Sequence, residues 1–236
     1  SIMLGSIAEG VTEVTGFLEG EDALATLQAF RDMGVVIEGP ERGRVRVHGV
    51  GLHGLKPAPG PLYVGNSGTS MRLLSGILSA QPFDTVMTGD ASLAKRPMER
   101  IAKPLRLMGA DIQTTGERGT PPVSVHGAST AAKGGLKGIH YDMPVASAQV
   151  KSGVLLAGLW ADGETSVTEP APTRDHTERM LKGFGYEVKV QGATASLRGG
   201  GKLTATKIDV PSDISSAAFF LVAASIAPNS DLTLEH

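Results

Sequence analysis

A threefold internal repeat constrains the fold of this chain more than any other feature. Gly34, Gly109 and Gly185 lie 75 and 76 residues apart, and each follows an amphipathic helix pattern and precedes an apolar strand pattern. A glycine at such a place commonly takes the left-handed conformation that ends a helix. A second strand pattern, which alternates apolar and polar residues, follows each glycine at residues 45–49, 123–127 and 195–199. The sequence therefore predicts three copies of one supersecondary unit.

Each copy also contains an earlier helix and strand. The helices are predicted at residues 1–9, 70–80 and 147–160, and the strands at residues 11–15, 84–88 and 164–168. The first helices carry almost no charge and are expected to be buried, whereas the second helices, such as 22–33 and 97–108, are amphipathic. We therefore predict an α/β (α+β) fold of three βαβαββ units with pseudo-threefold symmetry, in which sheets surround central buried helices.

The repeats also predict the domain organisation. One domain is expected over residues 1–207, with units at about 1–50, 60–128 and 135–200 and a glycine- and proline-rich linker at 49–61. A fourth unit begins in residues 208–236, with a strand at 208–210, an apolar helix at 215–226 and a strand start at 231–234. Because this unit is interrupted, we expect the chain to be part of a longer protein whose second domain is missing here. The apolar helix would then be exposed, or covered by a second copy.

Composition narrows the possible functions. A net charge of −2 and a pI near 6.3 argue against a nucleic-acid partner. The absence of cysteine excludes disulfides and thiolate metal sites, and no cluster of His, Asp and Glu has a metal-binding spacing, so neither a metal nor a cofactor is expected. The longest apolar stretch, residues 214–228, is too short to span a bilayer. These features are typical of a soluble globular protein.

The segment GNSGTSMR at residues 65–72 is the clearest candidate binding loop. It connects a short apolar strand to a helix, so several backbone N–H groups and the positive end of the helix dipole are available to an anion. Arg72 adds a planar guanidinium suited to phosphate or carboxylate. No Gly-Lys-Ser/Thr follows, so the loop is not a Walker A motif. A plain glycine turn at the start of a helix explains the spacing equally well.

Three further loops carry candidate anion contacts. Arg96 precedes Pro97 at a predicted helix start, Ser147 is a predicted N-cap, and Arg174 follows Thr173, another predicted N-cap. Taken singly, each loop is also explained by surface charge or by capping alone. Pseudo-symmetry would gather these helix N-termini at one end of the domain. The sequence therefore predicts one electropositive face on a slightly acidic chain.

Together these segments resemble the 5-enolpyruvylshikimate-3-phosphate (EPSP) synthase family, in the bacterial form often called class II. The matching segments are GNSGT at 65–69, GD at 89–90, KRPM at 95–98, SAQVKS at 147–152 and TRDHTE at 173–178. The resemblance implies an enolpyruvyl transferase fold of two domains with three βαβαββ units each. It also implies a cytoplasmic, monomeric enzyme of the shikimate pathway. This enzyme transfers the enolpyruvyl group of phosphoenolpyruvate to shikimate-3-phosphate, in aromatic amino-acid biosynthesis, without a cofactor.

The resemblance also implies roles for individual residues. The residues implied to bind phosphoenolpyruvate are Gly68, Arg96 and Gln149. Those implied to bind shikimate-3-phosphate are Ser147, Ala148, Gln149 and Arg174. The family's catalytic acidic residues and a basic segment are absent from this chain, so no residue in it is assigned as catalytic. We expect the chain alone to bind shikimate-3-phosphate weakly and to turn over nothing detectable; its sensitivity to glyphosate stays open.

Three other functions stay open at this point. UDP-N-acetylglucosamine enolpyruvyl transferase shares the fold and the donor, but its loop usually carries a cysteine, which this chain lacks. The RNA 3′-phosphate cyclase group shares the fold but is disfavoured by the acidic balance. A non-catalytic anion-binding module would need no further chemistry.

Overall fold

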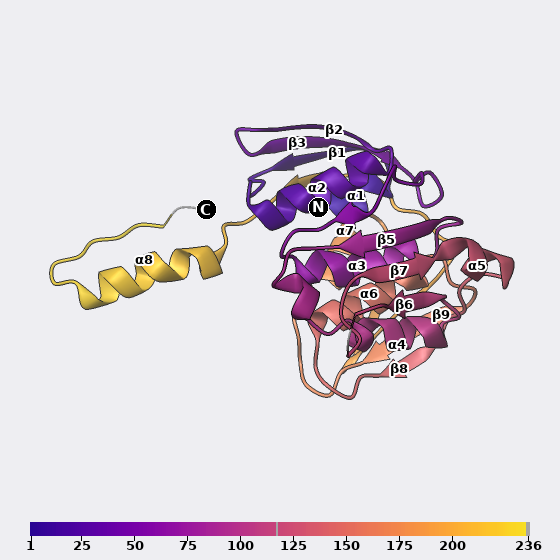
Figure 1. The fold of residues 1–236 in the computed structure, drawn as a ribbon. Helices are drawn as coiled ribbons and strands as arrows, with labels where there is room; N and C mark the ends of the chain where they lie inside the picture. Colours follow the sequence, from indigo (N-terminus) through magenta and orange to yellow (C-terminus); the bar gives the residue numbers. More distant parts are fainter. Residues whose placement is uncertain (117, 235–236) are drawn as a thin grey trace.

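Three mixed four-stranded sheets surround central helices in the computed structural model, which describes residues 1–116 and 118–234 (Figure 1). The strand orders are β12-β1-β3-β2, β4-β5-β7-β6 and β10-β11-β9-β8. In each sheet a lead-in strand runs parallel to its neighbour and the remaining pairs are antiparallel. The predicted fold class is confirmed.

The elements follow the predicted repeat. The first unit comprises α1 (Ile2–Ser6), β1 (Glu9–Thr15), α2 (Glu21–Asp32), β2 (Val36–Glu41) and β3 (Arg44–Val50). The second comprises β4 (Leu62–Tyr63), α3 (Gly68–Leu78), β5 (Asp84–Thr88), the 3-10 turn η1 (Leu93–Lys95), α4 (Glu99–Leu107), β6 (Ile112–Thr114), β7 (Val123–His126) and α5 (Gly127–Ala132). The third comprises β8 (His140–Asp142), α6 (Ala148–Gly158), β9 (Glu164–Thr168), α7 (His176–Gly183), β10 (Lys189–Gln191) and β11 (Thr194–Arg198).

The three repeat glycines have the conformation that the sequence predicted. Gly34, Gly109 and Gly185 have φ angles of 87°, 96° and 80°, in the left-handed region that favours glycine. Each lies directly after the second helix of its unit and turns the chain into the following strand. A left-handed glycine at the end of a helix therefore turns the chain into the next strand in all three units.

The two central helices, α3 and α6, are buried and meet at glycines. A Cβ atom on Gly76 would lie 2.1 Å from the carbonyl oxygen of Gly153, so only glycine permits this approach. Leu74, Ile77, Val154 and Leu155 are fully buried beside this contact. The close packing of α3 on α6 also brings their N-termini to the same end of the molecule.

The segment after the third unit differs from the prediction. β12 (Lys207–Asp209) pairs in parallel with β1, through Val14 and Ile208, and thus occupies in the first sheet the place that β4 and β8 have in theirs. The strand expected to open a fourth unit therefore completes the first sheet. The strand expected at residues 231–234 is not formed. The division of the chain at residue 207 stays a prediction.

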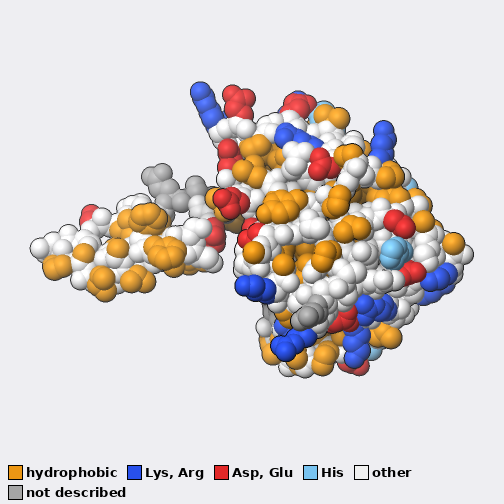
Figure 2. All heavy atoms as spheres, in the orientation of Figure 1, with side chains coloured by type: hydrophobic (Ala, Val, Ile, Leu, Met, Phe, Trp, Pro, Cys, Tyr) orange, Lys and Arg blue, Asp and Glu red, His pale blue; other side chains and the backbone are white. Residues whose placement is uncertain are grey.

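The last helix, α8 (Ile214–Ile226), projects away from the three sheets (Figure 1). None of its residues is buried, and Figure 2 shows hydrophobic side chains spread over its surface. Asp213 caps the helix by accepting hydrogen bonds from the backbone N–H groups of Ser215 and Ser216. Across the described residues, no helix combines the length and hydropathy that a bilayer crossing requires.

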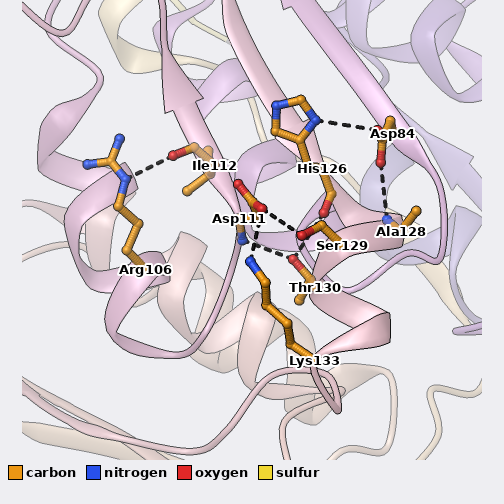
Figure 3. A network of polar contacts seen from close by, with 9 residues as sticks. All are labelled: Asp84, Arg106, Asp111, Ile112, His126, Ala128, Ser129, Thr130 and Lys133. Atoms are coloured by element: carbon orange, nitrogen blue, oxygen red, sulfur yellow. Dashed lines mark hydrogen bonds and ion pairs between the residues drawn. The ribbon is translucent and has the colours of Figure 1, made fainter.

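The short helix α5 was not predicted, and side-chain contacts fix it to the second sheet (Figure 3). The carboxylate of Asp111 accepts a hydrogen bond of 2.6 Å from the Ser129 hydroxyl and an ion-paired contact of 3.1 Å from Lys133. The backbone N–H of Asp111 donates to the Thr130 hydroxyl at 2.9 Å. The hydrogen bond from Ser129, followed by that from Lys133, lowers the pKa of Asp111 and keeps its carboxylate charged. α5 is therefore tied to the start of β6 through Asp111 and to β5 through Asp84, which accepts a hydrogen bond from the backbone N–H of Ala128.

Candidate anion-binding site

The N-termini of α3 and α6 lie together, each with a serine cap. Ser67 accepts a hydrogen bond from the backbone N–H of Ser70 at 3.1 Å, and Ser147 accepts one from Val150 at 3.3 Å. The cap predicted at Ser147 is confirmed. The side chain of Gln149, in the first turn of α6, also contacts the start of α3. The rest of each first turn is free to offer backbone N–H groups to an anion.

Gln149 and Arg72 make this contact. The Gln149 amide nitrogen donates to the Thr69 hydroxyl at 2.7 Å, and its amide oxygen accepts from Arg72 Nη1 at 2.6 Å. Arg72 also donates to the carbonyl oxygens of Gly68 at 3.3 Å and Pro97 at 3.0 Å. One guanidinium thus joins the glycine loop, α6 and the loop that carries Arg96.

Arg96 is held against the glycine loop from the other side. Its Nη2 donates to the side-chain oxygen of Asn66, whose amide nitrogen donates to Asp90 at 2.7 Å. Asp90 also accepts from the backbone N–H of Leu93 at 2.7 Å. The hydrogen bond from Asn66, followed by that from Leu93, lowers the pKa of Asp90. A charged carboxylate therefore orients the amide that orients Arg96.

Positive charge accumulates at this point. Burial lowers the pKa of Arg72 from its ordinary value, and repulsion from Arg100 and Arg96 adds to the effect. Within residues 1–116 and 118–234, none of these three guanidiniums has a carboxylate within 4.0 Å. Neighbouring cations that no carboxylate pairs with directly, beside two helix N-termini, favour a bound anion.

Gly68 lies directly beneath two of these guanidiniums. A Cβ atom built on Gly68 would lie 2.8 Å from Arg72 Nη1 and 3.3 Å from Arg96 Nη1. A side chain at this position would therefore displace Arg72 and crowd Arg96. The absence of a side chain keeps both guanidiniums close to the N-terminus of α3.

A hollow adjoins this cluster and shares Gln149 with it. Its volume is about 620 Å³, and its lining residues are Ala146, Ser147, Ala148, Gln149, Pro172, Thr173 and Arg174. It lies between the first turn of α6 and the loop that connects β9 to α7. Arg174 is exposed at the edge of this hollow. The six residues predicted from the sequence therefore form two adjoining groups that meet at Gln149.

Comparison with known proteins identifies the family. The family model for EPSP synthase (3-phosphoshikimate 1-carboxyvinyltransferase) matches residues 1–236. The chain belongs to the EPSP synthase family. Two relatives named 3-phosphoshikimate 1-carboxyvinyltransferase, from Methylococcus capsulatus and Alkalilimnicola ehrlichii, are 66% and 63% identical to it over 236 residues. These matches cover the whole chain and 53% and 52% of the relatives.

A solved family structure has the same fold. The EPSP synthase from Acinetobacter baumannii matches with a TM-score of 0.88 and 75% sequence identity, over 96% of this chain and 50% of that one. The chain thus spans about half the length of the relatives that it matches. The guanidinium cluster and the adjoining hollow therefore belong to a fold shared with a solved EPSP synthase.

Three features of the site differ from what the sequence predicted. Arg72 was predicted to supply a charge, but its central position depends on a contact with Gln149, 77 residues away, which no local pattern reveals. Thr173 does not cap α7, because the helix begins at His176 with Asp175 as its N-cap. α4 likewise begins at Glu99 rather than at Pro97.

Proposed function

We propose that this chain forms the substrate-binding face of an EPSP synthase. The enzyme transfers the enolpyruvyl group of phosphoenolpyruvate to the 5-hydroxyl of shikimate-3-phosphate and releases phosphate. The observation that carries the proposal is the contact between Arg72 and Gln149, which joins the guanidinium cluster at the glycine loop to the adjoining hollow. Two anionic substrates that react with each other require adjoining sites of this kind.

In this proposal phosphoenolpyruvate binds over the glycine loop. The backbone of Gly68 and the guanidinium of Arg96 contact its phosphate, and Gln149 reaches towards both substrates. The pairing of Asn66 with Asp90 supports this role, because it fixes the direction of Arg96 before any ligand arrives. Such preorganisation reduces the cost of desolvating a charged substrate.

Shikimate-3-phosphate binds in the hollow beside the guanidinium cluster, with its phosphate at the first turn of α6. Ser147 and Ala148 supply contacts at the helix start, and Arg174 approaches from the opposite wall. A volume of about 620 Å³ falls in the range of small-molecule sites, roughly 300 to 1,000 Å³.

The proton transfers of the reaction need acidic and basic groups near the reacting atoms. We assign these to the part of the relatives that lies beyond the match to this chain. The chain alone is therefore expected to bind shikimate-3-phosphate weakly and to form no product. The whole enzyme is proposed to act as a cytoplasmic monomer without metal or cofactor, with no nucleic-acid or membrane partner.

Calorimetric titration tests this proposal. The chain is titrated in parallel with shikimate-3-phosphate and with UDP-N-acetylglucosamine, and phosphate release is measured after phosphoenolpyruvate is added. We expect binding of shikimate-3-phosphate, no binding of the nucleotide sugar and no phosphate release. Tighter binding of UDP-N-acetylglucosamine would instead indicate the other enolpyruvyl transferase. Full-rate phosphate release would contradict the assignment of catalysis to the part of the relatives that lies beyond the match to this chain.

A further inference from the structure

A buried ion triad lies beneath the hollow between the start of α6 and the Arg174 loop. Lys151, on the first turns of α6, is 1% exposed, and its Nζ lies 3.0 Å from Glu169 Oε1 and 2.7 Å from Glu178 Oε1. Burial alone would lower the pKa of Lys151, but hydrogen bonds to Glu178 and Glu169 outweigh it and the pKa is raised. Lys151 is therefore a buried cation held by two carboxylates.

The two carboxylates flank the loop that carries Arg174. Glu169 directly follows β9, and Glu178 lies in the first turn of α7. The second oxygen of Glu169 accepts a hydrogen bond from the hydroxyl of Thr173, inside the loop. Glu169 and Glu178, at the two ends of the loop, thus pair with Lys151, and Thr173 within the loop is linked to it through Glu169.

Lys151 itself belongs to the helix that begins at the opposite wall of the hollow. Ser147, Ala148 and Gln149 occupy the start of the same helix, within about one turn of Lys151. A second contact reinforces the link, because the Thr177 hydroxyl donates to Ser152 at 2.7 Å. The distance between the two walls of the hollow therefore depends on this triad.

Stability alone does not explain such an arrangement. Buried ion pairs commonly contribute little compared with apolar side chains of similar size, because desolvation offsets their attraction. Here the second oxygen of Glu178 is buried and has no hydrogen-bond partner among the described residues, which adds to the cost. Charged groups, however, accept far fewer geometries than apolar ones do.

We propose that Lys151 is a positioning residue that fixes the Arg174 loop against the start of α6, and thereby sets the affinity for shikimate-3-phosphate. The choice of ligand rests on the proposed function above. Lys151 does not line the hollow, so it acts through Thr173 and Arg174 rather than by touching the substrate.

The variant Lys151→Met tests the proposal, since it keeps the length of the side chain and removes its charge. We measure ¹⁵N relaxation order parameters for the amides of Thr173 and Arg174, and the dissociation constant for shikimate-3-phosphate. In the wild type we expect order parameters near 0.85; in the variant we expect values below about 0.6 and about 10-fold weaker binding. The amides of Gly68 and Thr69, at the start of α3 outside the hollow, should be unchanged.

Two further variants make the test decisive. Lys137→Met removes a lysine whose ion pair with Asp162, at 3.1 Å, is exposed, and should change neither the loop nor the affinity. Glu169→Gln keeps the side-chain shape and removes one charge of the triad, and it replaces Lys151→Met if that variant does not fold.

A rigid loop in both triad variants, or a mobile loop with unchanged affinity, would overturn the proposal. So would a mobile loop in the wild type. If the wild type does not bind shikimate-3-phosphate, the proposed function fails, while the order parameters still decide whether Lys151 holds the loop.

Discussion

At the scale of single residues, the site depends on how closely two guanidiniums approach one backbone position. Gly68 lies beneath Arg72 and Arg96, and the amide oxygen of Gln149 accepts a hydrogen bond from Arg72. We predict that Gly68→Ala moves the Arg72 guanidinium away from Gln149, because the new Cβ would lie 2.8 Å from Arg72 Nη1. Affinity for phosphoenolpyruvate, measured by titration in the presence of shikimate-3-phosphate, should fall about 10- to 100-fold, the size of one lost charged hydrogen bond.

The control for this prediction is Gly60→Ala. An added Cβ at Gly60 meets nothing within 4 Å, so neither affinity nor stability should change. An unchanged affinity in Gly68→Ala would show that Arg72 takes no part in binding the substrate.

A single residue, Glu169, should also make the free energy of unfolding depend on pH. Burial alone would raise the pKa of Glu169, but hydrogen bonds from Thr173 and Lys151 lower it below its ordinary value of 4.5. A lowered pKa contributes stability that is complete above the unfolded pKa and is lost as pH falls through the folded one. The stability advantage of the wild type over Glu169→Gln, measured by urea unfolding, should therefore be constant near neutrality and shrink below about pH 4.5. A difference that does not vary with pH would contradict this assignment.

At the scale of elements, the packing of α3 on α6 aligns the two helix N-termini. We predict that Gly76→Ala lowers the free energy of unfolding by about 1–3 kcal/mol, because a Cβ would lie 2.1 Å from the Gly153 carbonyl oxygen and the helices must separate. Urea unfolding measures this loss. Shikimate-3-phosphate affinity should fall with it, since the same helices carry the site. Gly183→Ala, at an open position at the end of α7, should leave both unchanged.

The helices and strands also show how much of the fold and of the site could be predicted from the sequence. Local signals were sufficient for the three repeat glycines, the buried central helices and the cap at Ser147, because helix ends and apolar faces depend on near neighbours. Long-range pairings were not accessible: β12 meets β1 through residues 14 and 208, and Arg72 meets Gln149. The cap at Thr173 was wrong because its hydroxyl donates to Glu169 instead of accepting from the backbone of α7.

At the scale of the whole molecule, α8 is the feature that the three sheets leave uncovered. Phe219 is 81% exposed and Phe220 61% exposed. Apolar surface of this extent favours association. We predict that the chain self-associates in size-exclusion chromatography and that Phe219→Ser with Phe220→Ser shifts it towards monomer. Urea unfolding of the three-sheet body should change by no more than about 0.5 kcal/mol, as expected for exposed sites. A wild-type chain that is monomeric at all concentrations would contradict the prediction.

We propose, for the molecule as a whole, that segments from two repeats form one surface that binds two anions side by side. NMR mapping of ligand-induced shifts tests it most directly. Shikimate-3-phosphate should first perturb the amides of residues 147–149 and 173–175, and phosphoenolpyruvate added afterwards should perturb residues 66–69 and 96. Perturbations elsewhere, such as around the hollow beside Tyr186 and Lys189, or none at all, would contradict the account.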